Sequence, residues 1–230
     1  MKKTLLLLLL FITTQFLYAE VKWPTPIPNS KEERIQQIEK LSDQSDIDTN
    51  ANAARQLALT YGVFASLDEK TKENTKKGIT YFKRALKLAP DDVELMAYQG
   101  SLETTKSLYT EKLALKTLYA KKGFILMDKA IAKDNKHLGA LLARAKNSFN
   151  VPMILERLHY AEKDYNQILQ IITSEKVAKE RSTDDFTAQI LFDLGMVYEK
   201  MEEDDKAKEF FSRAKKLDAG FWSKKAGNKL

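Results

Sequence analysis

Apolar residues recur at helical spacing along most of the chain, and the clearest example lies near its carboxyl end. Leu191, Leu194, Tyr198 and Met201 fall at positions i, i+3, i+7 and i+10, which places them on one face of a helix. After the polar turn 202–205, a second apolar stripe consists of Ala207, Phe210, Phe211, Ala214 and Leu217. The pattern predicts two antiparallel helices that pack through these stripes.

Weaker copies of this hairpin precede it. Over the whole chain, the predicted hairpins span residues 51–90, 92–134, 137–174 and 185–218. No segment alternates apolar and polar residues over the length of a strand. A single hairpin cannot bury its own apolar face, so neighbouring hairpins must stack. We therefore predict an all-α fold, a right-handed α-solenoid of about four helical hairpins plus flanking helices, over residues 31–230.

The last hairpin resembles the tetratricopeptide repeat (TPR), a unit of about 34 residues. Leu194-Gly195, Tyr198, Ala207 and Phe211 follow the spacing of its signature. The chain departs from the signature at Leu191, where the repeat has Trp, and at Ala219, where it has Pro. The small residues Gly195, Ala207 and Ala214 would let the two helices cross closely, with aromatic rings on either side.

Shorter signals lie outside and between the hairpins. Ser30 and Glu33 form a capping box that predicts a helix from Lys31 to about Ser42. Another short helix is expected near 221–228, at the carboxyl end of the chain. Residues 107–120 look like an insertion that lengthens the two helices of the second hairpin.

The first 19 residues read as a secretory signal peptide. A basic start, Met1-Lys2-Lys3, precedes the apolar run 5–12, and Leu17-Tyr18-Ala19 resembles a cleavage site after Ala19. The apolar run is short for a membrane span, although an uncleaved anchor is the alternative. The character of the signal predicts bacterial export to the periplasm, with no stable membrane span after cleavage. The absence of cysteine excludes a lipidated cysteine, disulfides and thiolate metal sites.

Residues 20–30 form an extended arm. Pro24, Pro26 and Pro28 alternate with other residues, which excludes a helix and favours polyproline-like backbone. Trp23 either docks on the solenoid or lies against a partner, and we expect it to dock on the solenoid.

The charge pattern and the candidate metal-binding motifs do not indicate a nucleic-acid partner, a metal site or an enzymatic activity. The net charge is +6, but lysines and acids interleave as on solvated helix faces, so nucleic acid is not an expected partner. Glu156 and His159 match one Glu-x-x-His element of a di-iron bundle, which would need a second such element. Asp46, Asp48 and Asn50 begin like a calcium loop but lack its glycine, and capping of the next helix explains them better. We predict no metal, no cofactor and no enzymatic activity.

The resemblance to TPR proteins implies where a partner would bind. In that family the first helix of each hairpin lines a concave surface. Carried over to this chain, the partner-binding residues would be Arg55, Leu59, Tyr98, Lys146, Phe149, Phe192 and Met196. The paired Lys and Asn with which some family members grip a carboxylate are not found among them. The mixture suggests an apolar groove for a peptide or helix. The alternative is that these aromatic residues fill a core or a dimer contact.

The sequence leaves three candidate functions, each typical of a different class of protein. The favoured one is a non-catalytic periplasmic scaffold or adaptor that binds another envelope protein or peptide through its concave face, with a homo-oligomer possible. A second is an accessory subunit that resembles the T-component of a TRAP-type solute transporter, although no motif here is specific for that group. The third is a helical enzyme with a site that these motifs do not reveal.

Overall fold

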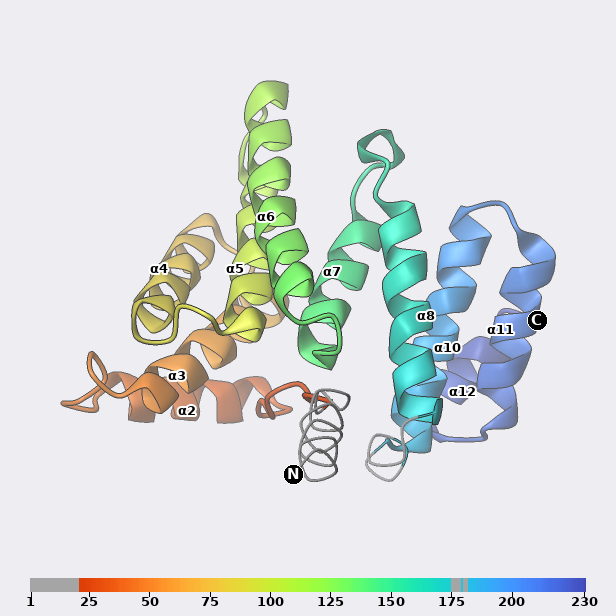
Figure 1. Ribbon diagram of the computed structural model, residues 1–230, viewed down its shortest axis with the longest axis horizontal. Coiled ribbons are helices and arrows are strands. Elements are labelled where there is room, and N and C mark those ends of the chain that lie inside the picture. The colour runs from red at the N-terminus through yellow and green to blue at the C-terminus, as the bar shows by residue number, and fades with distance from the viewer. Residues whose placement is uncertain (1–20, 175–178, 180–181) are drawn as a thin grey trace, which may run out of the picture.

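The computed structural model describes residues 21–174, 179 and 182–230, so the predicted signal peptide lies outside the described residues (Figure 1). The described part is built from helices and short helical turns. The α-helices are α2 (Lys31–Ser42), α3 (Ala51–Val63), α4 (Lys72–Leu88), α5 (Val93–Thr105), α6 (Leu113–Lys133), α7 (Leu138–Asn150), α8 (Leu158–Ser174), α10 (Asp184–Lys200), α11 (Asp204–Lys216) and α12 (Gly220–Gly227). Within these ranges the chain forms no β-strand, apart from one isolated β-bridge between Lys22 and His137.

Successive helices pair as hairpins and the hairpins stack. In the described ranges α3 packs on α4, α5 on α6, α7 on α8, and α10 on α11 (Figure 1). Each hairpin also contacts the next one, through α4 with α5, α5 with α7, and α8 with α10. The predicted all-α solenoid of stacked hairpins is confirmed.

Side-chain caps fix where several helices begin. Ser30 Oγ accepts a hydrogen bond from the Glu33 backbone, and the Glu33 carboxylate accepts one from the Ser30 backbone, as the capping box predicted. Asn50 caps α3 by accepting from the Ala53 backbone at 3.1 Å. Its amide also donates to Asp46, so capping accounts for part of the acidic cluster that resembles a calcium loop.

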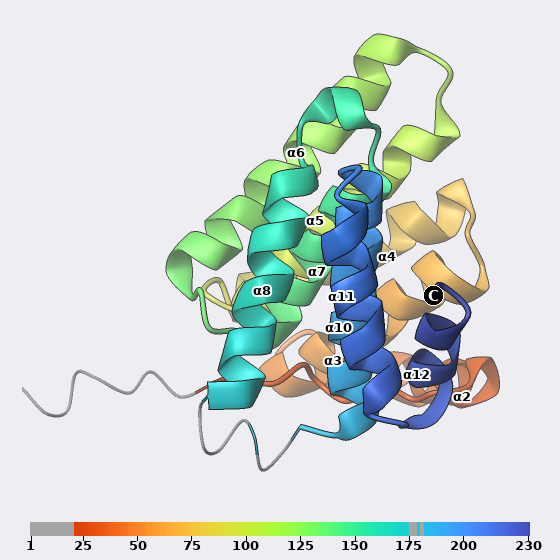
Figure 2. The ribbon, with the colours of Figure 1, turned by 90° about the vertical axis from the view of Figure 1, so that its right-hand side faces the viewer.

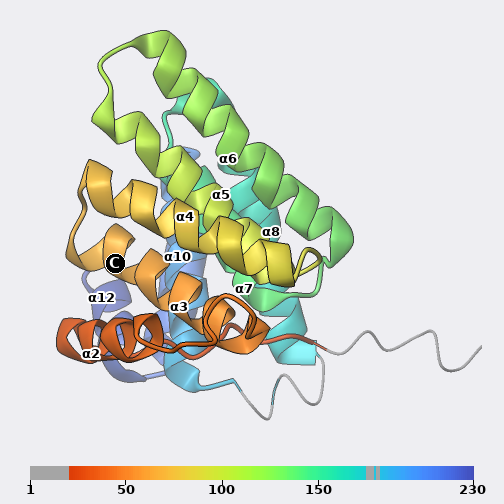
Figure 3. The same ribbon diagram turned by 90° about the vertical axis from the view of Figure 1, so that its left-hand side faces the viewer.

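The inserted segment forms the tip of the second hairpin. α5 ends at Thr105, a 3-10 turn follows at Lys106–Tyr109, and α6 begins at Leu113. The prediction that the insertion lengthens both helices is thus wrong for α5, and only α6 is long. The tip stands above the rest of the helical body in the three views (Figures 1, 2 and 3).

Among the described residues, the buried apolar side chains form two clusters that meet at α5. The smaller cluster contains residues of α2, α3 and α4, together with Leu95 and Leu102 of α5. The larger one contains Val93, Met96 and Ala97 of the same helix and extends to α12. Because α5 contributes side chains to both clusters, it joins the two halves of the solenoid.

Glycine permits the closest helix crossings. A Cβ atom placed on Gly195 would lie 2.5 Å from the ring of Phe211, which explains the small residue predicted at this crossing. At the crossing of α5 and α6, a Cβ on Gly123 would lie 2.4 Å from the carbonyl oxygen of Gly100. The obstacle at Gly123 is backbone, which cannot rotate away as a side chain can.

Ion pairs made by two arginines link helices within the third hairpin and link that hairpin to the preceding one. Arg144 of α7 makes two hydrogen bonds, of 2.7 and 2.8 Å, with the fully buried carboxylate of Asp164 on α8. It also donates to Asp128 of α6, which accepts from Arg157 as well. Arg144 therefore ties α7 to both α6 and α8, and Arg157 ties the turn before α8 to α6.

No helix within the described ranges is both long enough and apolar enough to cross a membrane.

The Gly123 crossing makes a testable prediction about stability. We expect Gly123→Ala to lower the free energy of unfolding by about 1–3 kcal/mol, because the added methyl group overlaps the backbone of α5. Urea unfolding followed by circular dichroism would measure the change. Gly227→Ala is the matched control, since its nearest contacts lie 3.8 Å away, and no loss is expected there. Equal stability of the two variants would contradict the close crossing.

Candidate peptide-binding surface

The first helices of the hairpins line two neighbouring hollows. One of about 210 Å³ lies between α3, α5 and α7, and Tyr98 and Lys146 are among its lining residues. The other, of about 320 Å³, lies between α7, α8, α10 and α12. Lys146 contributes to both hollows, so they form one continuous surface, which we call the concave surface.

The larger hollow is mainly aromatic, and we call it the aromatic cup. Its apolar lining residues are Phe149, Tyr165, Phe192, Met196 and Trp222. The ring of Phe192 packs 5.5 Å from that of Trp222 and 5.6 Å from that of Phe211, which fixes the floor of the cup. Aromatic and thioether side chains of this kind favour an apolar anchor from a ligand.

Charged groups surround this apolar floor. Lys225 of α12 places its ammonium group 4.8 Å from the ring centre of Phe192 and 5.0 Å from that of Trp222. Lys146 lies on the opposite helix, and Asp193 also lines the cup. The two cations exceed the single acid, so the rim favours a ligand that carries a carboxylate beside its apolar anchor.

Asp193 is held in an unfavourable environment. Burial raises the pKa of its carboxyl group to about 6, although Lys146, a hydrogen bond donated by Tyr165, and Lys225 all favour the ionised form. The same burial, together with Asp193, raises the pKa of the Tyr165 hydroxyl. An acid whose pKa is raised by burial and that lines a hollow is a candidate functional group.

The structure divides the residues that the sequence assigned to the concave face. Tyr98, Lys146, Phe149 and Met196 line the hollows. Leu59 is a correction, since only 1% of its surface is exposed and it belongs to the smaller core. Phe192 is a partial correction, because it lines the cup but is 4% exposed under Trp222 and Phe211.

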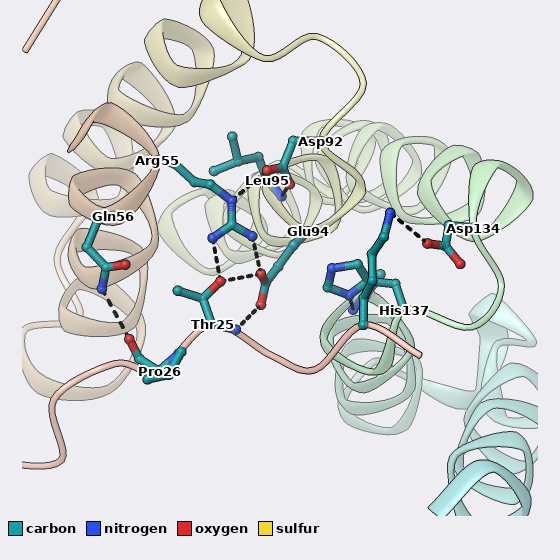
Figure 4. Close-up of polar contacts among 11 residues, drawn as sticks. Thr25, Pro26, Arg55, Gln56, Asp92, Glu94, Leu95, Asp134 and His137 are labelled. Carbon is teal, nitrogen blue, oxygen red and sulfur yellow. Dashed lines mark hydrogen bonds and ion pairs between the residues drawn. The ribbon is translucent and has the colours of Figure 1, made fainter. Parts of the chain in front are cut away.

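Arg55 is also corrected, because it holds the amino-terminal arm (Figure 4). Its guanidinium group pairs with Asp92 at 2.6 Å and with Glu94 at 2.5 Å, and it donates to the hydroxyl of Thr25. The Glu94 carboxylate in turn accepts hydrogen bonds from the backbone and hydroxyl of Thr25. Arg55 therefore serves the arm of its own chain.

The arm continues along the ends of the first helices. Gln56 donates to the carbonyl of Pro26 (Figure 4), and the backbone N–H of Leu138 donates to the carbonyl of Lys22. Val21 is buried in the larger core, and the ring of Trp23 lies 5.9 Å from that of Phe186 on α10. The prediction that Trp23 docks on the solenoid is confirmed.

Sequence reasoning missed several residues of the aromatic cup. Tyr165 comes from a second helix, which the repeat pattern places on the outside. Trp222 and Lys225 come from α12, a helix after the last repeat. An aromatic residue beside lysine in that short terminal helix was the available signal.

The candidate metal elements do not form a site. Glu156 has a left-handed backbone (φ 51°) and precedes α8, so it does not share a helical face with His159 as a Glu-x-x-His element requires. Among the residues the structure describes, no group of three His, Asp or Glu side chains could hold a metal ion.

Comparison with known proteins supports the repeat assignment. Residues 188–221 match the family model described as tetratricopeptide repeat, which covers α11 and most of α10. No curated protein and no solved structure matched the chain. Tetratricopeptide repeats are typical of protein-interaction scaffolds, so the match indicates a protein partner.

The Arg55 cluster predicts a large loss of stability on substitution. Arg55→Gln leaves the buried Glu94 carboxylate without its cation, and we expect a loss of about 2–4 kcal/mol in the free energy of unfolding. Lys31→Gln removes the exposed pair with Glu69 and should change the free energy of unfolding very little, because solvent screens an exposed pair. Denaturant titration of both variants measures the difference. Similar small losses would show that the arm is held without Arg55.

Asp193 predicts a pH-dependent effect. The pKa of Asp193 is raised to about 6 in the folded state, so ionisation of this carboxyl group destabilises the fold in full above pH 6. The destabilisation decreases as the pH falls and is absent below the pKa of an ordinary carboxyl group, where Asp193 is protonated in both the folded and the unfolded state. Asp193→Asn should therefore raise the free energy of unfolding by about 2 kcal/mol at neutral pH and by much less in acid. Unfolding curves at several pH values test this. A gain that does not vary with pH would contradict the raised pKa.

Proposed function

We propose that this protein is a non-catalytic periplasmic adaptor that binds a segment of another envelope protein in the aromatic cup. The observation that carries the proposal is the cup itself, an open hollow of about 320 Å³ with aromatic walls and a charged rim. Ligand sites in proteins commonly combine an apolar lining with a few placed polar groups. The tetratricopeptide-repeat match at residues 188–221 includes the cup residues of α10 and supports a protein as the ligand.

The chemistry of the cup favours a particular kind of segment. An aromatic or aliphatic side chain would occupy the space between Phe149, Met196 and Trp222. An acidic residue next to this anchor would lie near Lys146 and Lys225. Such a segment would gain affinity mainly from the anchor, and the lysines would favour acidic over basic partners.

Periplasmic location is proposed from the amino-terminal residues. The basic start, the apolar run 5–12 and Ala19 together form an export signal. Cleavage after Ala19 would leave Glu20 as the first residue, next to Val21, which begins the docked arm.

Site-specific crosslinking in intact cells tests the partner and its site. We expect a photoreactive amino acid at Met196 to crosslink to one distinct envelope protein, because this side chain lines the cup. The same group at Lys208, an exposed position on α11, should not yield that product. Lys225→Glu should weaken the Met196 crosslink if the bound segment is acidic.

The controls separate binding from folding and from location. Met196→Ala should keep its melting temperature yet lose partner binding, whereas Phe192→Ala should lose about 3–5 kcal/mol of stability because its ring is buried. Crosslinks only between copies of this chain would replace the adaptor with a homo-oligomer.

The mass of the protein released by osmotic shock should correspond to a chain that begins at Glu20. Recovery of the protein from the cytoplasm, with residues 1–19 still attached, would contradict export.

A further inference from the structure

The tip of the α5–α6 hairpin exposes large apolar side chains. The side chains of Leu108 and Leu113 are 70% and 77% exposed, although leucine is normally buried. Met153 and Ile154, which are 54% and 87% exposed, lie in the turn between α7 and α8 at the same end of the molecule (Figure 1). Apolar side chains gathered at one protruding end indicate a contact with an apolar phase or partner.

Lysines surround this apolar tip. Residues 106–122 contain five lysines and a single acid, Glu111. The beginning of α4 adds Lys72 and Lys76, which line a hollow beside the tip. Glu111 lies 3.7 Å from Lys116, and Glu103 pairs with Lys106 at 3.1 Å. The cations still outnumber the acids, so the tip attracts anions.

The hollow beside the tip offers polar groups to an anion. It has a volume of about 140 Å³, and its polar lining consists of Lys72, Lys76, Lys106, Tyr109, Thr110 and Tyr119. The hydroxyl oxygen of Tyr109 is shielded from solvent and has no hydrogen-bond partner among the described residues. Lys72 and Lys76 form no ion pair with any carboxylate in the described part of the chain. A buried hydroxyl without a partner is unfavourable unless a ligand supplies one.

We propose that this tip binds the surface of an anionic phospholipid membrane. A headgroup phosphate occupies the hollow, where it accepts hydrogen bonds from the lysines and from Tyr109. Leu108 and Leu113 enter the acyl region beside it, while Tyr109 and Tyr119 lie at the level of the headgroups. The proposal does not depend on the function of the aromatic cup.

The arrangement favours a membrane over the other anionic ligands. A soluble phosphate would satisfy the hollow but would leave the leucines in water. A protein partner would satisfy the leucines, yet the tip is a narrow end that projects from the helical body (Figures 2 and 3) and offers a partner little area. A lipid bilayer supplies phosphate and hydrocarbon at adjacent depths, and the tip carries lysines and exposed leucines close together in the chain.

Vesicle flotation of the full mature protein tests the proposal. We expect binding to vesicles of phosphatidylcholine mixed with phosphatidylglycerol and little binding to phosphatidylcholine alone. Lys72→Gln combined with Lys76→Gln should weaken binding roughly thirtyfold, because each lysine near an anionic surface usually contributes a factor of about five to the affinity and the two factors multiply. Leu108→Glu combined with Leu113→Glu should abolish it, and Tyr109→Phe should weaken it several-fold.

Matched controls exclude general effects of charge and exposure. Lys208→Gln combined with Lys216→Gln removes the same charge from α11, and Phe221→Glu changes an exposed apolar residue on α12, which lies away from the tip (Figure 1). Neither should reduce vesicle binding. Equal binding to both vesicle types, no binding, or equal losses in the control variants would each overturn the proposal. So would glycerol phosphate binding with full affinity to the leucine double variant, which would identify a soluble anion as the ligand.

Discussion

The fold depends on α5, a helix that is buried over most of its surface. α5 packs into the smaller core with Leu95 and Leu102, and into the larger core with Val93, Met96 and Ala97. Glu94 of the same helix is buried as the anchor of the arm. Because α5 meets α3, α4, α6 and α7, the two halves of the solenoid cannot move independently without exposing it. The close crossing at Gly100 and Gly123 follows from this crowding.

Local signals in the sequence predicted most of the fold, for identifiable reasons. The capping box at Ser30 and the apolar stripes of α10 and α11 act within one or two helical turns, so the sequence displays them directly. The Arg55 cluster could not be predicted in this way. Thr25, Arg55 and Glu94 lie 30 to 69 residues apart along the chain, and only the stacking of α3 on α5 brings them together.

In the candidate site too, a local sequence pattern could not predict which residues of one helix face are accessible. Phe192 and Met196 lie one turn apart on α10, and a periodic pattern assigns them the same environment. They differ because Trp222 of α12 packs on Phe192, whereas Met196 keeps a partly exposed side chain that lines the cup. Leu59 fails as a surface residue for a related reason, since α2 and the arm close that end of the concave surface. A helix that follows the last repeat therefore decides which residues of the repeat are accessible.

The arm shows how this scaffold holds an extended peptide. Its backbone forms hydrogen bonds with Glu94 and Leu138, and Trp23 packs on Phe186, so recognition combines main-chain contacts with an aromatic anchor. This intramolecular peptide occupies the beginnings of the first helices, whereas the aromatic cup lies farther along α7 and α10. The tip that carries Leu108 lies on a separate hairpin. Because the three surfaces share no side chain, occupation of the proposed site in the cup would leave the proposed site at the tip accessible.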